Sequence, residues 1–186
     1  MFDAPGERWE QREFEDEDFA ESELDELVTV GCSFVTCDFH CAVLSSSRHE
    51  RTSFAACSFR NARLGGAVFD GCRLTGCDFL DAHLRGTEFR ECDLTGASLG
   101  GALLRERDLS RCRLAEANLV DADLSGSSLA DADLRGVRLG NTVLRDADLR
   151  GARLEGFDPR RADLRGARID VEHAVLLVGA FGVVIG

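Results

Sequence analysis

The hydrophobic positions of this chain recur every five residues, a spacing that fits neither an α-helix nor a plain β-strand. Leu124, Leu129 and Leu134 show it within the segment ADLSGSSLADADLRG. Steps of five rotate a helical position by about 140° each, so the leucines would be scattered around the helix. On a plain strand the side chains alternate, so an odd step changes the face. The period therefore predicts a repeat architecture.

The five-residue register holds from Phe14 to Ile169. Of the 32 positions in this series, which we call centres, 29 are Leu, Phe or Ile, and the exceptions are Thr29, His49 and Pro159. The residue two before each centre is usually Ala or Cys and shares its side of a short strand. The residue two after is Gly in 12 of the 32 units, which suits the dihedral angles of a corner. Each unit is predicted to be a short edge followed by a bend, with one large and one small residue facing inward.

Similar centres recur every 20 residues, which predicts a coil with four sides. The first column contains Phe14, Phe34 and Phe54, the second contains Phe19, Phe39, Phe59 and Phe79, and the third is leucine throughout. Cysteines in the small inward position occur only in the first two columns, at Cys32, Cys72, Cys92 and Cys112 and at Cys37, Cys57 and Cys77. We therefore expect an all-β solenoid of about eight coils over residues 12–169, with stacked phenylalanines inside its N-terminal half and a rise of about 4.8 Å per coil.

Composition argues against several classes of partner and chemistry. The net charge is -12, from 34 acidic and 22 basic residues, which disfavours direct contact with nucleic acid or anionic membranes. The longest apolar run, residues 174–186, is 13 residues long, too short to cross a bilayer. With no signal-peptide pattern at the start, we expect a cytoplasmic protein. The eight cysteines form no CxxC pair and the four histidines are scattered, so we interpret the cysteines as reduced packing residues.

No catalytic pattern is present, and we expect no enzyme activity, no catalytic residues, no cofactor and no metal. The chain contains no GxSxG, Walker or HExxH motif, and a packed interior would leave no ligand cavity. Two residues depart from the repeat. His49 at a centre is either a contact for a partner or a tolerated defect. Arg107 occupies a small inward position, where an unpaired guanidinium would be costly, so we expect a local bulge or an outward turn there.

The two ends of the solenoid differ in character. Residues 1–11 form a lead segment, and residues 1–30 contain 12 acidic residues and two arginines. This acidity either protects an exposed strand edge from aggregation or forms one pole of a polyanionic binding surface.

At the other end, residues 170–186 predict a short α-helix with Asp170 as its N-cap. Apolar residues recur at three- and four-residue steps, at Val171, Ala174, Val175, Val178 and Phe181. This face either caps the open coil or joins two copies as a homodimer. Because one helix cannot bury apolar residues on two sides against one coil, we expect both.

The repeated units resemble the pentapeptide-repeat family. The sequence ADLRG occurs at 132–136, 147–151 and 162–166, and the resemblance covers roughly residues 12–169. It implies a right-handed quadrilateral parallel β-helix. The tail ARIDVEHAVLLVGAFGVVIG and the start FEDEDF further resemble the MfpA-type, Qnr-related members. That resemblance implies binding to DNA gyrase, a link to fluoroquinolone resistance, mimicry of duplex DNA and a dimer through the C-terminal ends. The chain has no insertion that would form Qnr-like projecting loops.

Acidic residues gather along the second column and form what we call the acidic strip. Its members are Glu17, Asp18, Glu21, Asp38, Asp78, Asp81 and Asp121. The third column instead carries an outward row of arginines, at Arg85, Arg105, Arg145 and Arg165. We therefore expect a DNA-mimicking gyrase binder that modulates or inhibits supercoiling and protects against fluoroquinolones or gyrase toxins. The alternative is a general pentapeptide-repeat scaffold for another protein, because the solenoid alone does not fix a partner.

Overall fold

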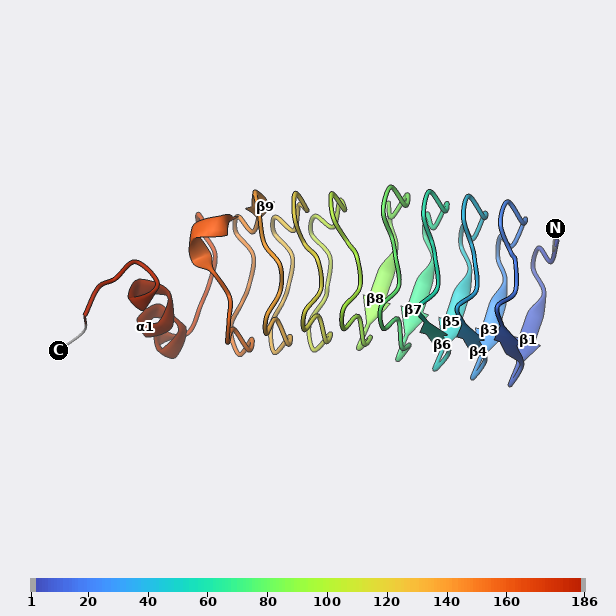
Figure 1. Cartoon of the computed structure of the whole chain (residues 1–186), viewed down its shortest axis with the longest axis horizontal. Coiled ribbons are helices and arrows are strands. Elements are labelled where there is room, and N and C mark those ends of the chain that lie inside the picture. The colour runs from blue at the N-terminus through green and yellow to red at the C-terminus, as the bar shows by residue number, and fades with distance from the viewer. Residues whose placement is uncertain (1–2, 185–186) are drawn as a thin grey trace.

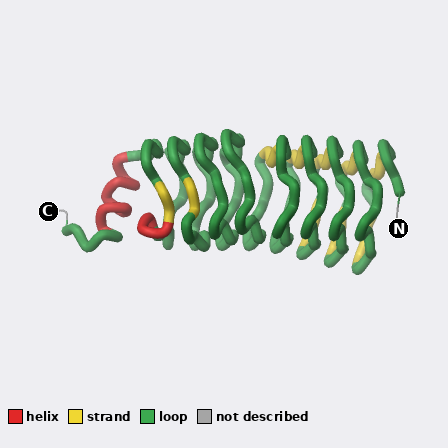
Figure 2. The backbone as a smooth tube through the Cα atoms, turned by 90° about the horizontal axis from the view of Figure 1, so that it is seen from above, coloured by secondary structure: helices red, strands yellow, loops and turns green. Residues whose placement is uncertain are grey.

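The protein is a parallel β-solenoid of about eight turns followed by one short helix (Figure 1). The computed structural model describes residues 3–184. The coils stack along one axis, so the described chain ends lie at opposite ends of a rod (Figures 1 and 2). The predicted β-helix with a short C-terminal helix is confirmed.

Within residues 3–184 three sheets run along the rod, and every strand pair in them is parallel. One contains β1 (Arg8–Glu10), β3 (Val28–Val30), β5 (Arg48–Glu50), β7 (Val68–Asp70) and β8 (Glu88–Arg90). The second contains β2 (Glu13–Glu15), β4 (Ser33–Val35) and β6 (Ser53–Ala55), and the third pairs β9 (Thr142–Val143) with β10 (Ala162–Asp163). The register places Phe14 beside Phe34. Partners are 20 residues apart, as the sequence predicts.

Between these strands, the edges pair through single β-bridges with the same step, for example Asp18 with Asp38. In the second and third columns the edge closes into a turn, as where the Ser47 N–H donates to the Leu44 carbonyl over 3.2 Å. Corners adopt positive φ whether or not they are glycine, as at Asp121 (60°). Glycine is needed at Gly86, where φ is 79° and an added Cβ would lie 3.4 Å from the Gly66 backbone nitrogen.

The core is a set of stacked ladders of like side chains. The ring centroids of Phe14 and Phe34 lie 4.8 Å apart, and Phe34 repeats that separation with Phe54. In the next column the stacked separations run from 4.9 to 5.0 Å along Phe19, Phe39, Phe59 and Phe79. Adjacent columns meet edge to face, an arrangement that favours aromatic pairs. The predicted phenylalanine stacks are confirmed.

The cysteines pack as small inward residues. All except half-buried Cys41 are buried, and all eight are free thiols. The Cys92 thiol donates to the Phe69 carbonyl over 3.4 Å, a contact with the preceding coil. Burial raises the pKa of Cys72 and of Cys112 to about 11, so these thiols stay protonated at neutral pH.

The structure at Arg107 differs from the expected bulge or outward turn. The five-residue register continues, because Asp108 bridges Ser128 and the Ser128 N–H donates to the Arg107 carbonyl. The Arg107 Nε is buried with no hydrogen-bond partner. The side chain is accommodated instead by a separation of neighbouring coils, which is seen as a wider spacing just after β8 (Figures 1 and 2).

The solenoid ends in η1 (Pro159–Arg161), a 3₁₀ turn, and then α1 (Val171–Gly179). Asp170 occupies the N-cap of α1, but its carboxylate makes no capping bond and accepts the Gly151 N–H of the preceding coil. Leu177 is the buried residue of α1. None of the helices among residues 3–184 has the length and apolar character needed to span a membrane.

Candidate functional site

The first row of the acidic strip consists of Asp18, Asp38 and Asp78. Parallel bridges connect Asp18 to Asp38, Asp38 to Ser58 and Ser58 to Asp78, so these side chains lie one above another. Each carboxylate accepts the backbone N–H two residues later, at 2.9 Å for Asp18 and Asp38 and 3.0 Å for Asp78. These bonds stabilise the turn and hold the carboxylates in a fixed line on the surface.

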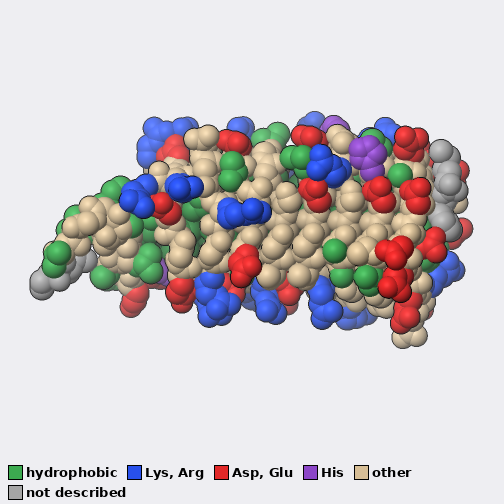
Figure 3. Space-filling model, in the orientation of Figure 1, with side chains coloured by type: hydrophobic (Ala, Val, Ile, Leu, Met, Phe, Trp, Pro, Cys, Tyr) green, Lys and Arg blue, Asp and Glu red, His purple; other side chains and the backbone are tan. Residues whose placement is uncertain are grey.

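The second row of the strip lies at the corners beside the first row. Glu21, Asp81 and Asp121 are exposed and adopt φ of 58°, 58° and 60°. Neutral residues separate them at Cys41, Asn61 and Gly101. Glu17 is exposed in the first coil. The structure thus brings six of the seven residues into two adjacent rows, with Glu17 beside them in the first coil, and acidic side chains are dense at the N-terminal end of the rod (Figure 3).

Most of the strip's charge is not neutralised within the protein. Asp78 pairs with Arg60, with Asp78 Oδ2 3.0 Å from Arg60 Nη1. Asp121 Oδ1 accepts the side-chain amide of Asn141 at 3.0 Å. Among residues 3–184, the other strip members form no ion pair. The strip therefore offers carboxylates that a cationic partner can reach.

The C-terminal half is electrostatically different, because several of its aspartates are paired with the arginine two residues later. In Asp133–Arg135, the guanidinium donates from Nε at 2.8 Å and from Nη2 at 2.7 Å. Asp148 and Arg150 repeat this geometry at 2.8 and 2.6 Å, and the guanidinium lowers the pKa of Asp148 to about 2. The DLR triplet could have signalled these pairs, since residues two apart share one side of a strand.

The arginine row of the third column is also partly neutralised. Arg105 Nε lies 2.7 Å from Asp123 Oδ2, and Arg145 Nε lies 2.5 Å from Asp163 Oδ2. Asp163 also pairs with Arg165. Arg85 forms no ion pair within the described part of the chain. Only Arg85 of this row lies in the N-terminal half, so the arginine row accompanies the acidic strip over only part of its length.

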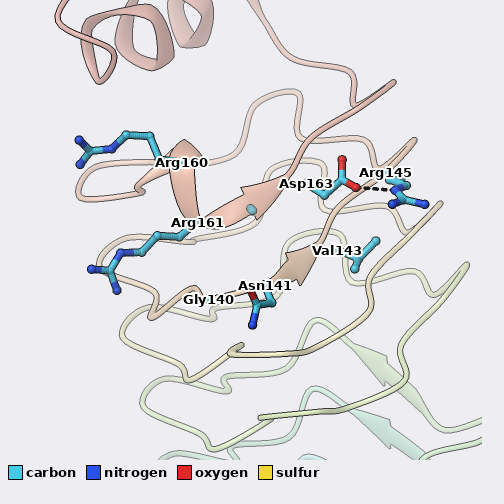
Figure 4. A pocket seen from close by; sticks show the side chains of 8 residues that line it. Gly140, Asn141, Val143, Arg145, Arg160, Arg161 and Asp163 are labelled. Carbon is cyan, nitrogen blue, oxygen red and sulfur yellow. Dashed lines mark hydrogen bonds and ion pairs between the residues drawn. The ribbon is translucent and has the colours of Figure 1, made fainter.

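The acidic strip ends before the last coils, where arginines predominate. A surface cavity of about 550 Å³ lies between Asn141, Arg145 and the η1 residues Arg160 and Arg161. Figure 4 shows Arg160 and Arg161 projecting from η1 on one side and the Asp163–Arg145 pair on the other. Both η1 arginines pair with Asp158, so this end has little acidic surface to continue the strip.

The expected dimer face is largely uncovered in the single chain. Val171 is 80% exposed and Phe181 64%, and Val175 and Val178 are also exposed, whereas Ala174 is half-buried. Leu177, on another side of α1, packs towards the last coil. A cavity of about 600 Å³ between α1 and the coil is lined by Pro159, Leu164, Leu177 and Phe181, among others. The last coil is therefore incompletely covered by its own chain.

The histidines and the other potential metal ligands are dispersed over the described part of the rod. No group of three or more His, Cys, Asp or Glu side chains there is arranged to hold a metal ion. His49 is buried rather than presented to a partner, and its ring stacks 4.7 Å from that of Phe69. His83 is exposed.

Family models match most of the repeat region. Residues 42–119 match the model described as a pentapeptide repeat region. Residues 108–146 and 142–170 match the model for pentapeptide repeats in eight copies. Among curated proteins, no sequence matches this chain.

Similar solved structures extend over nearly the whole chain. One is a trypsin-treated variant of QnrB1, a plasmid-mediated fluoroquinolone resistance protein, with 25% identity and a TM-score of 0.86 over 98% of this chain and 91% of that one. Another is HetL of Nostoc sp. strain PCC 7120, a pentapeptide repeat protein involved in heterocyst differentiation regulation. Its identity is 27% and its TM-score 0.56, over 89% of this chain and 78% of HetL.

Proposed function

Because this chain belongs to the pentapeptide-repeat family, we propose that it is a DNA-mimicking protein that binds DNA gyrase and modulates or inhibits supercoiling. In this proposal it also protects gyrase from fluoroquinolones or from gyrase toxins. Support comes from the likeness to QnrB1, a fluoroquinolone resistance protein, over nearly the full length of both chains. The MfpA-like tail and acidic start support the same function.

The acidic strip is the observation that carries this proposal. Successive carboxylates in its first row are separated by one coil, about 4.8 Å, or by two coils where Ser58 intervenes. One strand of B-DNA carries a phosphate about every 3.4 Å. Two adjacent rows of anchored carboxylates therefore present negative charge at a density of the same order. A cationic surface that accepts duplex DNA is a suitable partner, and long-range attraction would accelerate the encounter.

We also propose a division of the chain into a lead segment at 1–11, a β-helix at 12–169 and a dimerisation segment at 170–186. Residues 1–2 and 185–186 lie outside the described structure. The lead segment contains β1, which pairs with β3 and so extends the sheet. A dimer through Val171, Ala174, Val175, Val178 and Phe181 would place two strips at the outer ends and the arginine-rich coils in the middle. Gyrase would then contact each protomer separately on its N-terminal part.

A supercoiling assay with purified gyrase tests the proposal directly. The protein is titrated with and without a fluoroquinolone, and we expect inhibition or drug protection at micromolar concentration or below. The test variant replaces Asp78, Asp81 and Asp121 with lysine. It contains one ion-paired acid and two corner acids.

The matched control is chosen from other faces of the rod. It replaces with lysine Glu91, which pairs with Arg111 at 2.8 Å, and the corner acids Asp131 and Asp146, whose φ values are 59° and 56°. The net charge change is the same in both variants. The strip variant should lose the inhibition or drug protection and its salt dependence, whereas the control variant should keep both. Equal loss in both would refute a specific strip.

The alternative is a scaffold for a protein other than gyrase. HetL shares the repeat architecture, and its described role is in heterocyst differentiation regulation, so the solenoid by itself does not select gyrase. A well-folded protein that leaves supercoiling unchanged with and without drug would favour this second function.

A further inference from the structure

The ladder of hydrogen bonds between coils is interrupted on two faces of the rod. Within residues 3–184, no backbone hydrogen bond joins residues 81–91 to residues 100–110. In the preceding coil, the Leu64 N–H donates to the His83 carbonyl, and in the following one the Leu104 N–H donates to the Asp123 carbonyl. The corresponding bond from Leu84 to residue 103 is absent. We call this interruption the seam.

The seam does not extend around the whole coil. On the other two faces the ladder continues, because the Phe79 N–H donates to the Ser98 carbonyl and the Arg113 N–H donates to the Cys92 carbonyl. Figures 1 and 2 show the wider spacing after the coil that contains β8. The two coils are therefore separated on one side of the rod and remain hydrogen-bonded on the other.

Arg107 explains why the coils part at this point. Its inward position holds Ala67, Ser127 and Ala147 in other coils, which are all buried. The turn bond from the inward residue to the centre three before it, present at Ser127 and Ala147, is absent at Arg107. A guanidinium cannot be enclosed without partners at acceptable free energy. Separation of the coils gives its head access to the cleft, although Nε remains buried and without a partner.

The opened seam is lined by surface cavities that differ in charge. The largest there, about 610 Å³, is mainly cationic and apolar, with Leu103, His83, Arg85, Arg105 and Arg107 in its wall and Asp81 as its one acidic residue. Leu103 is 67% exposed, an unusual state for a leucine in the β-helix. A second cavity of about 410 Å³ also contacts Arg107, but its other lining residues are Arg90 and the acidic Glu88, Glu106 and Asp108. The carboxylate contacts of the proposal below therefore belong to the first cavity.

We propose that the seam is a docking groove for an extended, carboxylate-bearing peptide segment of a partner protein. Its walls present backbone N–H and C=O groups that elsewhere in the rod are used in strand pairing. An extended peptide supplies the complementary groups, as in β-strand addition. Arg85 and Arg107 form no ion pair within the described residues, so they are available to bind a carboxylate. The exposed Leu103 side chain provides an apolar contact for an alternate peptide residue.

Asp81 of the acidic strip lies in the wall of this groove, but the arginines and Leu103 that would contact the peptide are outside the strip, so the test does not depend on gyrase. The probe is a fluorescein-labelled peptide of alternating valine and glutamate, about nine residues long and thus about 30 Å when extended. In one comparison peptide lysine replaces glutamate. In the other, the backbone nitrogens of the valines are methylated. Binding is measured by fluorescence anisotropy, with inorganic phosphate as a competitor.

Three variants connect binding to the seam. Arg107→Ala restores the small residue found in neighbouring coils and should close the ladder, so it should abolish binding. It should also slow amide hydrogen exchange at residues 81–91 and 100–110. Arg85→Ala leaves the seam open and should weaken binding by about tenfold, through loss of one charge-assisted contact. Arg138→Ala, an exposed arginine distant in sequence from the seam, should change neither measurement.

The outcomes are decisive in either direction. Binding of the glutamate peptide that exceeds the lysine and methylated peptides, and that is lost in Arg107→Ala, supports the proposal. Full displacement by phosphate would show a simple anion site and overturn it. Failure of every peptide to bind at millimolar concentration would also overturn it, as would binding that Arg107→Ala leaves unchanged.

Discussion

Acidification should destabilise this protein through His49 before its paired carboxylates are titrated. The imidazole is 1% exposed, with Nδ1 2.8 Å from Thr29 Oγ1 and Nε2 3.0 Å from Ser47 Oγ. Because the Ser47 hydroxyl donates to the Leu44 carbonyl at 2.7 Å, its oxygen accepts from Nε2–H, and Nδ1 accepts from Thr29. The ring thus fits its site as the neutral form, and burial lowers its pKa to about 3.

The size of the effect follows from the two pKa values. In the unfolded chain His49 titrates near 6.5, so between about pH 6.5 and 3 the unfolded state binds a proton that the folded state does not. Stability must therefore fall as the pH decreases through this window. Between pH 7.5 and pH 5.0, the loss from this single group is about 2 kcal/mol.

The measurement compares the protein with His49→Phe, which retains a flat ring between Thr29 and Phe69. The variant should be less stable at pH 7.5 by about 1–3 kcal/mol, because buried hydroxyls lose a partner. Urea unfolding followed by circular dichroism at pH 7.5 and 5.0 gives the pH-dependent loss for each protein. The carboxylates contribute equally to the pH dependence of both proteins. The difference between the two losses of unfolding free energy therefore comes from His49. Identical pH dependence in the two proteins would contradict a buried neutral imidazole.

Three further predictions concern the dimer, the core and the thiols. Val175→Asp with Val178→Asp should convert a dimer to a monomer in light scattering, whereas a monomeric parent protein would refute the C-terminal interface. Phe54→Ala should lower the free energy of unfolding by about 3–5 kcal/mol, since it leaves a cavity between stacked rings; a loss below about 1 kcal/mol would contradict the rigid stack. A thiol reagent should modify only Cys41 in the folded protein, and Cys41→Ser should remove this reaction; rapid reaction of Cys72 would show that the coils open readily.

The solenoid could be predicted from the order of residues because its contacts repeat at a fixed interval. Residues 20 apart lie side by side in the coil, so similar residues sorted at that step, such as Phe14, Phe34 and Phe54, already reveal neighbours in space. The acidic strip was visible for the same reason. The corners were only partly evident, because many of them, such as Asp121, adopt positive φ without being glycine.

Other features emerged only in three dimensions, because they depend on how neighbouring coils pack against each other. The repeat pattern showed that Arg107 occupies an inward position. Whether the chain responds with a bulge or with separated coils depends on whether breaking backbone hydrogen bonds costs less free energy than enclosing the guanidinium. The pairing of Asp163 with Arg145, which lies 18 residues earlier, depends on side-chain reach between coils. The contact made by Leu177 depends on how α1 meets the last coil, a contact outside the repeat. The period fixes backbone neighbours, whereas side-chain partners and non-repeating contacts are settled by packing in three dimensions.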